Sequence, residues 1–255
     1  MPNRAALTGK TIWLTRPAGQ GEELCARLEA LGAQVHMLPL LVIKPLEPSL
    51  AERQKLIGLD RYDLVLFVST NAAVRGLELI GQWWPQYPAG IVNCAVGPGT
   101  AAVLESHGLS VIYPRERMSS EALLALPPLQ CIEGKKALIV RGAGGREIIA
   151  DGLHARGAAV DYVELYERAS PAYSAEHIDA LLRSAAPDAI VISSAEALDN
   201  LKTLFALVPG WKQLPLVVSS LRLAEHAKAA GFQSISVIEG ATDTAIIAGL
   251  LSLWG

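Results

Sequence analysis

The residues of this sequence best suited to chemistry lie in loops that follow short, apolar, β-rich runs and lead into helical patterns. These loops are small, hydroxylated and rich in glycine, and they are 16–19, 69–71, 97–100, 115–120, 141–146, 193–196, 219–222 and 241–243. Such loops expose backbone N–H groups, and the dipole of the following helix favours an anion, so carboxylates or phosphates suit them. An alternative is that the Ser, Thr, Asn and Asp residues only cap helices. Eight loops in two sets favour a polyanionic ligand.

Three arginines in these loops are candidates for binding such an anion. Arg16 and Arg141 follow matching strands, and Arg146 opens the next helix. Each guanidinium could hold a carboxylate through two parallel hydrogen bonds. A solvated salt bridge with Glu22 or Glu147 is the alternative. The glycines of the 141–146 loop do not predict a nucleotide site, because Glu147 stands where a GxGxxG motif needs its last glycine and no Walker lysine follows.

Side-chain nucleophiles with an adjacent base are not recognisable in the sequence. The serines lack a GxSxG elbow, and the cysteines lack a suitable histidine. Any catalysis would therefore need positioning plus one acid or base, for which Tyr166 is the best candidate. An internal repeat places Leu41 opposite it, so a phenol stands where the other copy is apolar. The alternative is a tyrosine packed between lobes with its hydroxyl bonded to backbone.

That repeat organises the chain, since residues 9–40 align without gaps with residues 134–165, 125 positions later. About 12 of the 32 positions are identical. The register continues into Asp63/Asp188 and Ser69/Ser194 and then slips by two residues. The chain is therefore predicted to be a pseudo-duplicate that binds its ligand between two halves.

Each half alternates β-rich runs with helical patterns, which predicts parallel sheets covered by helices. The predicted strands are 11–15, 34–38, 64–68, 91–96 and 110–113 in the first half, and 136–140, 159–163, 189–193, 216–219 and 234–238 in the second. Leu24 and Leu28 lie on one face of the first helix, and Gly32 and Gly157 are expected to end equivalent helices as C′ glycines.

Two extended, proline-flanked segments, 39–48 and 164–171, interrupt this pattern. Proline disfavours helix there, so both are predicted to be linkers, although ordinary loops within one lobe are the alternative. A third proline-rich stretch, 127–133, joins the two copies, and local sequence leaves open a simple division into lobes at that point.

Composition excludes several functional classes. With 51% apolar and 18% charged residues, the chain of 255 residues is predicted to be soluble and globular, and the absence of a long apolar run or secretory signal places it in the cytoplasm with no membrane partner. The net charge of −3 without a basic block argues against nucleic acid. Cys25, Cys94 and Cys131 are expected to be small core residues, and the five histidines lack metal-ligand spacing.

Taken in order, several segments resemble bacterial uroporphyrinogen-III synthases over essentially the whole chain: LTRPAGQGEELCARLEALGAQVHMLPLLVIKP, FVSTNAAV, AVGPGTAAVLESHGL, IVRGAGGREIIADGLHARGAAVDYVELYER and VVSSLRLAEHAKAAGF. The resemblance implies a cofactor-free, monomeric hydro-lyase of haem and sirohaem biosynthesis. Such enzymes convert hydroxymethylbilane, an octacarboxylate, to uroporphyrinogen III with loss of water and inversion of the last pyrrole. Transient hand-over of this substrate from hydroxymethylbilane synthase would fit that role.

The resemblance also implies an α/β fold of two flavodoxin-like parallel-sheet lobes joined by a two-stranded hinge. Residues 1–38 plus 170–255 would form one discontinuous lobe and 42–165 the other, with 39–41 and 166–169 as hinge segments. Tyr166 would protonate the leaving hydroxyl. The predicted substrate-binding residues are Arg16, Ser69, Thr70, Asn71, Gly97, Thr100, Arg141, Gly142, Arg146, Ser194, Ala195 and Ser220; no metal ligand is predicted. Leu223 replaces the threonine of some relatives, so contact there would come from backbone.

Two other functions are compatible with parts of the sequence. A two-lobed protein that only binds a small polyanionic ligand would need no break of the repeat at Tyr166. A nucleotide-sugar transferase with paired α/β lobes would need a diphosphate site, which the glycine-rich loop 141–146 supports only weakly.

Overall fold

The computed structural model describes residues 6–115, 118–145 and 147–254. The chain divides into two compact units, one formed by Met1–Val42 with Ala169–Gly255 and the other by Ile43–Arg168. The chain therefore passes out of the first unit near residue 42 and returns to it near residue 169. A boundary within 127–133 does not match these units.

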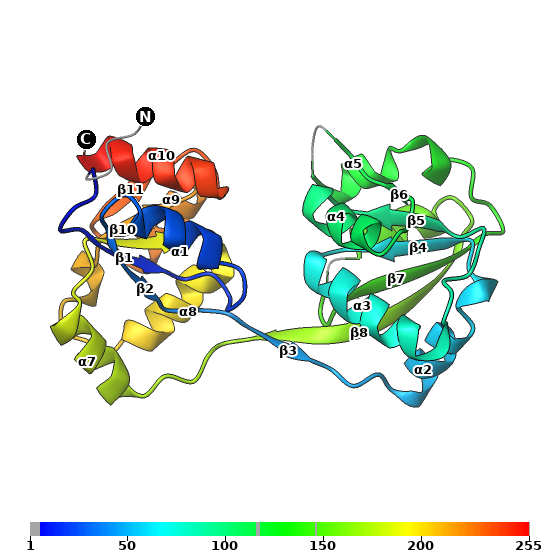
Figure 1. Ribbon diagram of the computed structural model, residues 1–255, viewed down its shortest axis with the longest axis horizontal. Coiled ribbons are helices and arrows are strands. Elements are labelled where there is room, and N and C mark those ends of the chain that lie inside the picture. The colour runs from blue at the N-terminus through cyan, green and yellow to red at the C-terminus, as the bar shows by residue number, and fades with distance from the viewer. Residues whose placement is uncertain (1–5, 116–117, 146, 255) are drawn as a thin grey trace. The chain divides into compact units, whose positions relative to one another are not determined.

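The first unit contains a five-stranded sheet in the order β11-β10-β9-β1-β2, in which all neighbouring strands are parallel. Its strands are β1 (Thr11–Leu14), β2 (Gln34–Met37), β9 (Ala189–Ile192), β10 (Leu216–Val218) and β11 (Ile235–Val237). Its helices are α1 (Glu22–Glu29), α7 (Ala175–Ser184), α8 (Ala195–Phe205), α9 (Leu221–Ala230) and α10 (Asp243–Trp254), with a short 3₁₀ helix at Trp211–Gln213. Helices α1, α8 and α9 each follow one strand of this sheet and lead to the next (Figure 1), the connection that parallel pairing requires, and α10 follows β11.

Helices cover both faces of this sheet, because successive strand residues point to opposite sides. Trp13 packs with α8 and α9, whereas its neighbours Ile12 and Leu14 pack with α1 and α10. All three residues are fully or almost fully buried. This double burial explains why the central strands β1, β9 and β10 are almost entirely apolar and so could be recognised in the sequence.

The second unit contains a six-stranded sheet in the order β3-β8-β7-β4-β5-β6. Its strands are β3 (Val42–Pro45), β4 (Leu64–Phe67), β5 (Val92–Ala95), β6 (Val111–Ile112), β7 (Lys136–Gly142) and β8 (Ala159–Ala169). Its helices are α2 (Leu50–Ile57), α3 (Thr70–Trp83), α4 (Pro98–Ser106), α5 (Ser120–Leu124) and α6 (Ile148–His154), with 3₁₀ helices at Leu59–Arg61 and Pro127–Leu129. From β8 to β6 the strands pair in parallel, so the carboxyl ends of β4, β5 and β7 lie at one edge.

The sequence predicts five strands for each lobe. This prediction is wrong for the second unit, whose sheet has β3 as a sixth strand. The two segments predicted as linkers are extended, but they take part in pairing: β3 lies beside β8, and the N–H of Leu46 donates to the carbonyl of Leu165 at 2.9 Å. Residues 166–169 are the end of β8 itself. Leu40 is fully buried in the core of the first unit, which holds segment 39–41 there.

The C′ glycines are confirmed by their hydrogen bonds. Gly32 has a φ of +93°, its N–H donates to Glu29, and the N–H of Ala33 reaches back to Leu28. Gly157 makes the same pair of bonds after α6, at a φ of +80°. This is the Schellman arrangement, in which a left-handed residue satisfies the last helical carbonyls.

The cysteine prediction is only partly confirmed. Cys94 is buried, and this burial raises its pKa to about 12, whereas Cys25 is half-buried and Cys131 is exposed. Among the described residues, no helix is long and apolar enough to cross a membrane.

Candidate functional site

Tyr166 and Ser69 lie together in the second unit, where their hydroxyl oxygens are 2.9 Å apart. Tyr166 is on β8 and is only 3% exposed. Ser69 follows β4 and is the N-cap of α3, where its Oγ accepts the N–H of Ala72 at 3.0 Å. The phenol therefore ends beside the N-terminus of a helix of 14 residues.

The ring of Tyr166 is held against β7. A Cβ atom at Gly142 would fall 2.6 Å from the ring atoms Cε2 and Cζ, so only glycine permits this approach. The N–H of Ala143 donates to the carbonyl of Tyr166 at 2.8 Å. The pairing register of β7 with β8 shifts between Arg141 and Gly142, which brings Gly142 opposite Tyr166.

Tyr166 lines a cavity of about 600 Å³ at the carboxyl ends of β4, β5 and β7. Val68 and Val96, the residues before the N-caps of α3 and α4, also line it. The remaining lining residues are Met118, Ser119, Ser120, Glu121, Ile139, Arg141, Gly142, Ala143, Gly144, Gly145, Ile148, Ile149, Tyr162 and Arg168. The cavity thus has two phenols, Tyr162 and Tyr166, in a wall of mixed apolar and polar residues beside two helix N-termini.

Arg141 is bound to protein carboxylates. Its Nη1 lies 2.9 Å from Glu147, its Nη2 lies 2.9 Å from Glu164, and its guanidinium stacks 4.1 Å from the ring centroid of Tyr162. Tyr162 also donates a hydrogen bond to Glu147. That bond, followed by the bonds from Arg141, lowers the pKa of Glu147, while burial and Glu147 raise the pKa of Tyr162 to about 12. The structure therefore gives Arg141 the salt bridge that the sequence left as an alternative.

The other predicted residues of the second unit lie at two helix N-termini. Thr70 and Asn71 open α3 behind Ser69, and Gly97 is the N-cap of α4. Thr100 is buried in the first turn of α4. Arg146 is outside the described residues.

The predicted residues of the first unit lie at equivalent helix ends. Ser194 and Ser220 are N-caps of α8 and α9 and accept N–H groups at 3.1 and 3.2 Å, as the capping alternative expects. With Ala195 and Arg222 they line a hollow of about 410 Å³. Arg16 is bound to Asp243 at 2.6 Å and to the carbonyl of Ala241 at 2.7 Å, and not to Glu22. The Glu22 carboxylate instead accepts the N–H groups of Gly19 and Gly21.

Arg168, which lines the cavity that holds Tyr166, is missing from the predicted residues, and Ser119 lies in the predicted loop 115–120 without being singled out. Arg168 could have been found, because residues two apart on a strand face the same side and Tyr166 was already singled out. Ser119 caps α5, where its Oγ accepts the N–H of Ala122. No signal in the sequence separates it from the other capping serines.

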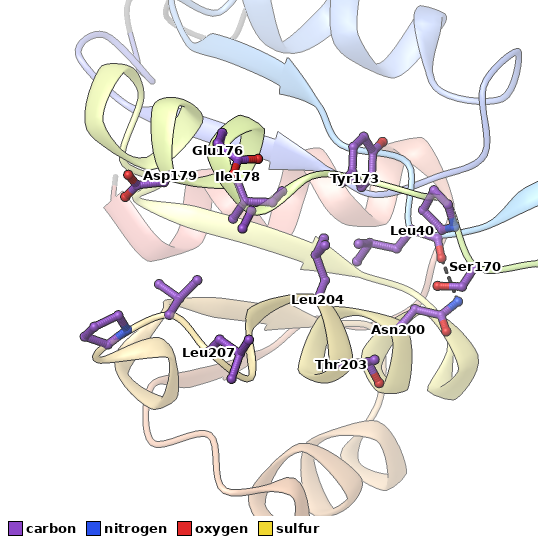
Figure 2. Close-up of a pocket in the computed structure, with 14 residues that line it drawn as sticks. Leu40, Ser170, Tyr173, Glu176, Ile178, Asp179, Asn200, Thr203, Leu204 and Leu207 are labelled. Atoms are coloured by element: carbon purple, nitrogen blue, oxygen red, sulfur yellow. Dashed lines mark hydrogen bonds between the residues drawn. The ribbon is translucent and has the colours of Figure 1, made fainter.

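A second cavity, of about 620 Å³, lies between α7 and α8 of the first unit. Figure 2 shows Leu40, Ile178 and Leu204 facing it and Asn200 donating to the carbonyl of Leu40, a bond of 2.7 Å. None of the predicted site residues is among the fourteen described residues that line it. Across the described part of the chain, no group of three or more His, Cys, Asp or Glu side chains could hold a metal ion.

One protein-family model matches most of this chain. The model described as uroporphyrinogen-III synthase HemD matches residues 22–248. The uroporphyrinogen-III synthase of Escherichia coli K12 is 36% identical over 94% of this chain and 99% of its own length, and that of Salmonella typhimurium is 37% identical over the same shares.

Solved structures agree in fold. The uroporphyrinogen-III synthetase from Helicobacter pylori superimposes with a TM-score of 0.62 at 15% identity, covering 96% of this chain and 99% of that one. A mutant uroporphyrinogen III synthase from Thermus thermophilus gives a TM-score of 0.58 at 18% identity, with coverage of 95% and 97%. The expected α/β fold with mainly parallel sheets is confirmed.

Proposed function

Because this chain belongs to the uroporphyrinogen-III synthase family, we propose that it is the enzyme that cyclises linear hydroxymethylbilane to uroporphyrinogen III. The reaction expels the substrate's hydroxyl as water and closes the ring with the last pyrrole inverted, which makes the enzyme a hydro-lyase. The observation that carries this proposal is the identity of more than a third of residues along almost the whole of this chain and of its relatives.

Tyr166 is the proposed proton donor. As the carbon–oxygen bond of the hydroxymethyl group breaks, the phenol proton leaves with the hydroxyl as water, and the pyrrole nitrogen stabilises the cationic carbon. The ring carbon that closes the macrocycle later loses a proton, which balances the one that Tyr166 supplied. General acid catalysis of this kind contributes about 10²–10⁴-fold to the rate. The buried phenol on the cavity wall supports this role.

The carboxylates of the substrate are proposed to bind at helix N-termini through backbone N–H groups. In the second unit these are the first turns of α3 and α4, with Thr70, Asn71, Gly97 and Thr100. In the first unit they are the first turns of α8 and α9, with Ser194, Ala195 and Ser220. The helix dipole and the free N–H groups stabilise an anion most strongly when it binds at the first turn of the helix.

Arg141 and Arg16 are proposed to shape the loops around them rather than to hold substrate. Arg141 already has two carboxylate partners and an aromatic ring beneath it, so a substrate carboxylate would have to displace one of them. Arg16 likewise joins the start of α10 to the loop after β1. Gly142 belongs to the site because it admits the ring of Tyr166.

We further propose that the chain arose by duplication and that its first unit and its middle part exchanged βαβ segments. Supporting this, β1 and β2 stand in one sheet where β7 and β8 stand in the other, 125 residues later, and β9 corresponds to β4 at the same offset. The lobes would be 1–38 plus 170–255 and 42–165. The connections at 39–41 and 166–169 would act as the hinge.

A protein that only binds a polyanion is not favoured, because the curated relatives are named as synthases. Hand-over of hydroxymethylbilane from the synthase that makes it remains a proposal that fits the chemistry of the substrate.

The test is to incubate the purified protein with freshly generated hydroxymethylbilane, oxidise the products and separate the type I and type III uroporphyrin isomers by chromatography. Predominantly type III product is expected. Type I product at the uncatalysed rate would overturn the proposed function.

A further inference from the structure

The hydroxyl groups of Ser69 and Tyr166 form a hydrogen bond whose direction decides where the phenol proton points. A serine hydroxyl carries one proton and two acceptor lone pairs, and so does a phenol apart from its more acidic proton. The Ala72 N–H of the helix cap occupies one lone pair of Ser69 Oγ at 3.0 Å, and Tyr166 Oη lies 2.9 Å from the same oxygen.

Either oxygen can be the donor in this contact, and the two directions place the phenol proton differently. If Tyr166 donates to Ser69, the phenol proton is held between the two oxygens and does not face the cavity. If Ser69 donates, its oxygen still accepts the Ala72 N–H, and Tyr166 Oη accepts the serine proton. The proton of Tyr166 is then free to point to the cavity that the phenol lines.

We infer that Ser69 is a positioning residue, which donates its proton to Tyr166 Oη so that the phenol proton points to the substrate. This inference rests on the proposed function. After Tyr166 gives its proton to the leaving hydroxyl, the same Ser69 hydrogen bond stabilises the phenolate, and charge-assisted bonds are stronger than neutral ones. The cap of α3 fixes the serine, since its oxygen cannot turn away without releasing Ala72.

Substitutions at Ser69 can separate this role from helix capping. Ser69→Ala removes both the cap and the bond to Tyr166. Ser69→Asp keeps a good N-cap, because a carboxylate accepts the Ala72 N–H. However, a carboxylate cannot donate, so it would accept the phenol proton and turn it away from the cavity. Ser69→Thr keeps both functions.

The experiment measures kcat, KM and the urea midpoint of these three variants, each in the parent and in the Tyr166→Phe background. We expect Ser69→Thr to match the parent, Ser69→Ala to lower kcat roughly five- to tenfold, as loss of one hydrogen bond would, and Ser69→Asp to lower it further. The urea midpoint should follow a different order, with Ser69→Ala the least stable. In Tyr166→Phe the three substitutions should leave kcat unchanged.

Ser174 provides the matched control, because it caps α7 and accepts the N–H of His177 at 3.2 Å. Ser174→Ala and Ser174→Asp should leave kcat unchanged. Full turnover in Ser69→Asp, or equal losses with and without the Tyr166 hydroxyl, would overturn the inference. If the parent makes only type I product, the proposed function has failed; if the parent makes type III and the Ser69 variants do not follow the expected order, only the inference has failed.

Discussion

Gly142 and Tyr166 are in such close contact that a methyl group on the glycine would fall 2.6 Å from the phenol ring. The two residues belong to neighbouring strands and face each other just past a register shift. The position of the proposed proton donor therefore depends on a residue that has no side chain.

Gly142→Ala is expected to push the ring out of place, with an unfolding free energy lower by about 1–3 kcal/mol and turnover lower by at least roughly tenfold. Urea unfolding and kcat would measure the two effects. Gly81→Ala is the control, since Gly81 is an exposed residue within α3 whose added Cβ would meet nothing within 4 Å. That variant should be as stable as the parent or more so. An unperturbed Gly142→Ala enzyme would refute the contact.

Arg141→Lys is expected to lower the unfolding free energy by about 1–3 kcal/mol, because lysine can neither bridge Glu147 and Glu164 nor stack flat on Tyr162. KM should change less than twofold if Arg141 shapes the loop and does not bind substrate. Arg183→Lys, at an exposed pair with Asp179 on α7, should stay within about 0.5 kcal/mol of the parent. A large rise in KM with unchanged stability would restore Arg141 as a substrate ligand.

The second unit is expected to lose stability in acid in part through Glu52. Partial burial alone would raise the pKa of this carboxylate, but hydrogen bonds from the N–H of Glu164 and from Ser49 outweigh it and lower the pKa. A lowered pKa means that its stabilisation is complete above the ordinary glutamate pKa of about 4.3 and is lost as the pH falls through the lower value.

Glu52→Gln should therefore flatten part of the dependence of the urea midpoint on pH between about 3 and 5. Glu105→Gln, at an exposed carboxylate of α4, should leave the dependence as in the parent. Equal slopes in all three proteins would show that Glu52 does not contribute.

Local pattern predicted most of the fold, and contacts between distant residues account for what it missed. The strand Leu64–Phe67 is predicted from its sequence because it belongs to an apolar run, 64–68, that is bounded by Asp63 and Ser69. The local sequence predicts a linker at Val42–Pro45, because its partner β8 lies more than 110 residues away and the flanking prolines give no sign of strand pairing. For the same reason the sequence predicts a linker from residue 164, where the structure continues β8 to Ala169.

The site shows the same limit. The residue types at the strand ends predict an anionic ligand and a single acid–base residue. The break in the repeat at Tyr166 makes that tyrosine the candidate. The contact of Tyr166 with Ser69 spans 97 positions, and that of Arg16 with Asp243 spans 227. No local sequence pattern predicts such distant pairs. The sequence therefore indicates Arg16 as a functional candidate but not Asp243 as its salt-bridge partner.

The most direct test of the central claim is the turnover of Tyr166→Phe, which removes only the hydroxyl and leaves the ring packed against Gly142. With type III product followed from hydroxymethylbilane at saturation, kcat is predicted to fall by on the order of a hundredfold or more, further than in Thr100→Ala or Ser69→Ala, while the urea midpoint stays close to that of the parent. A folded Tyr166→Phe enzyme with the parent's kcat would contradict the assignment of Tyr166 as the proton donor.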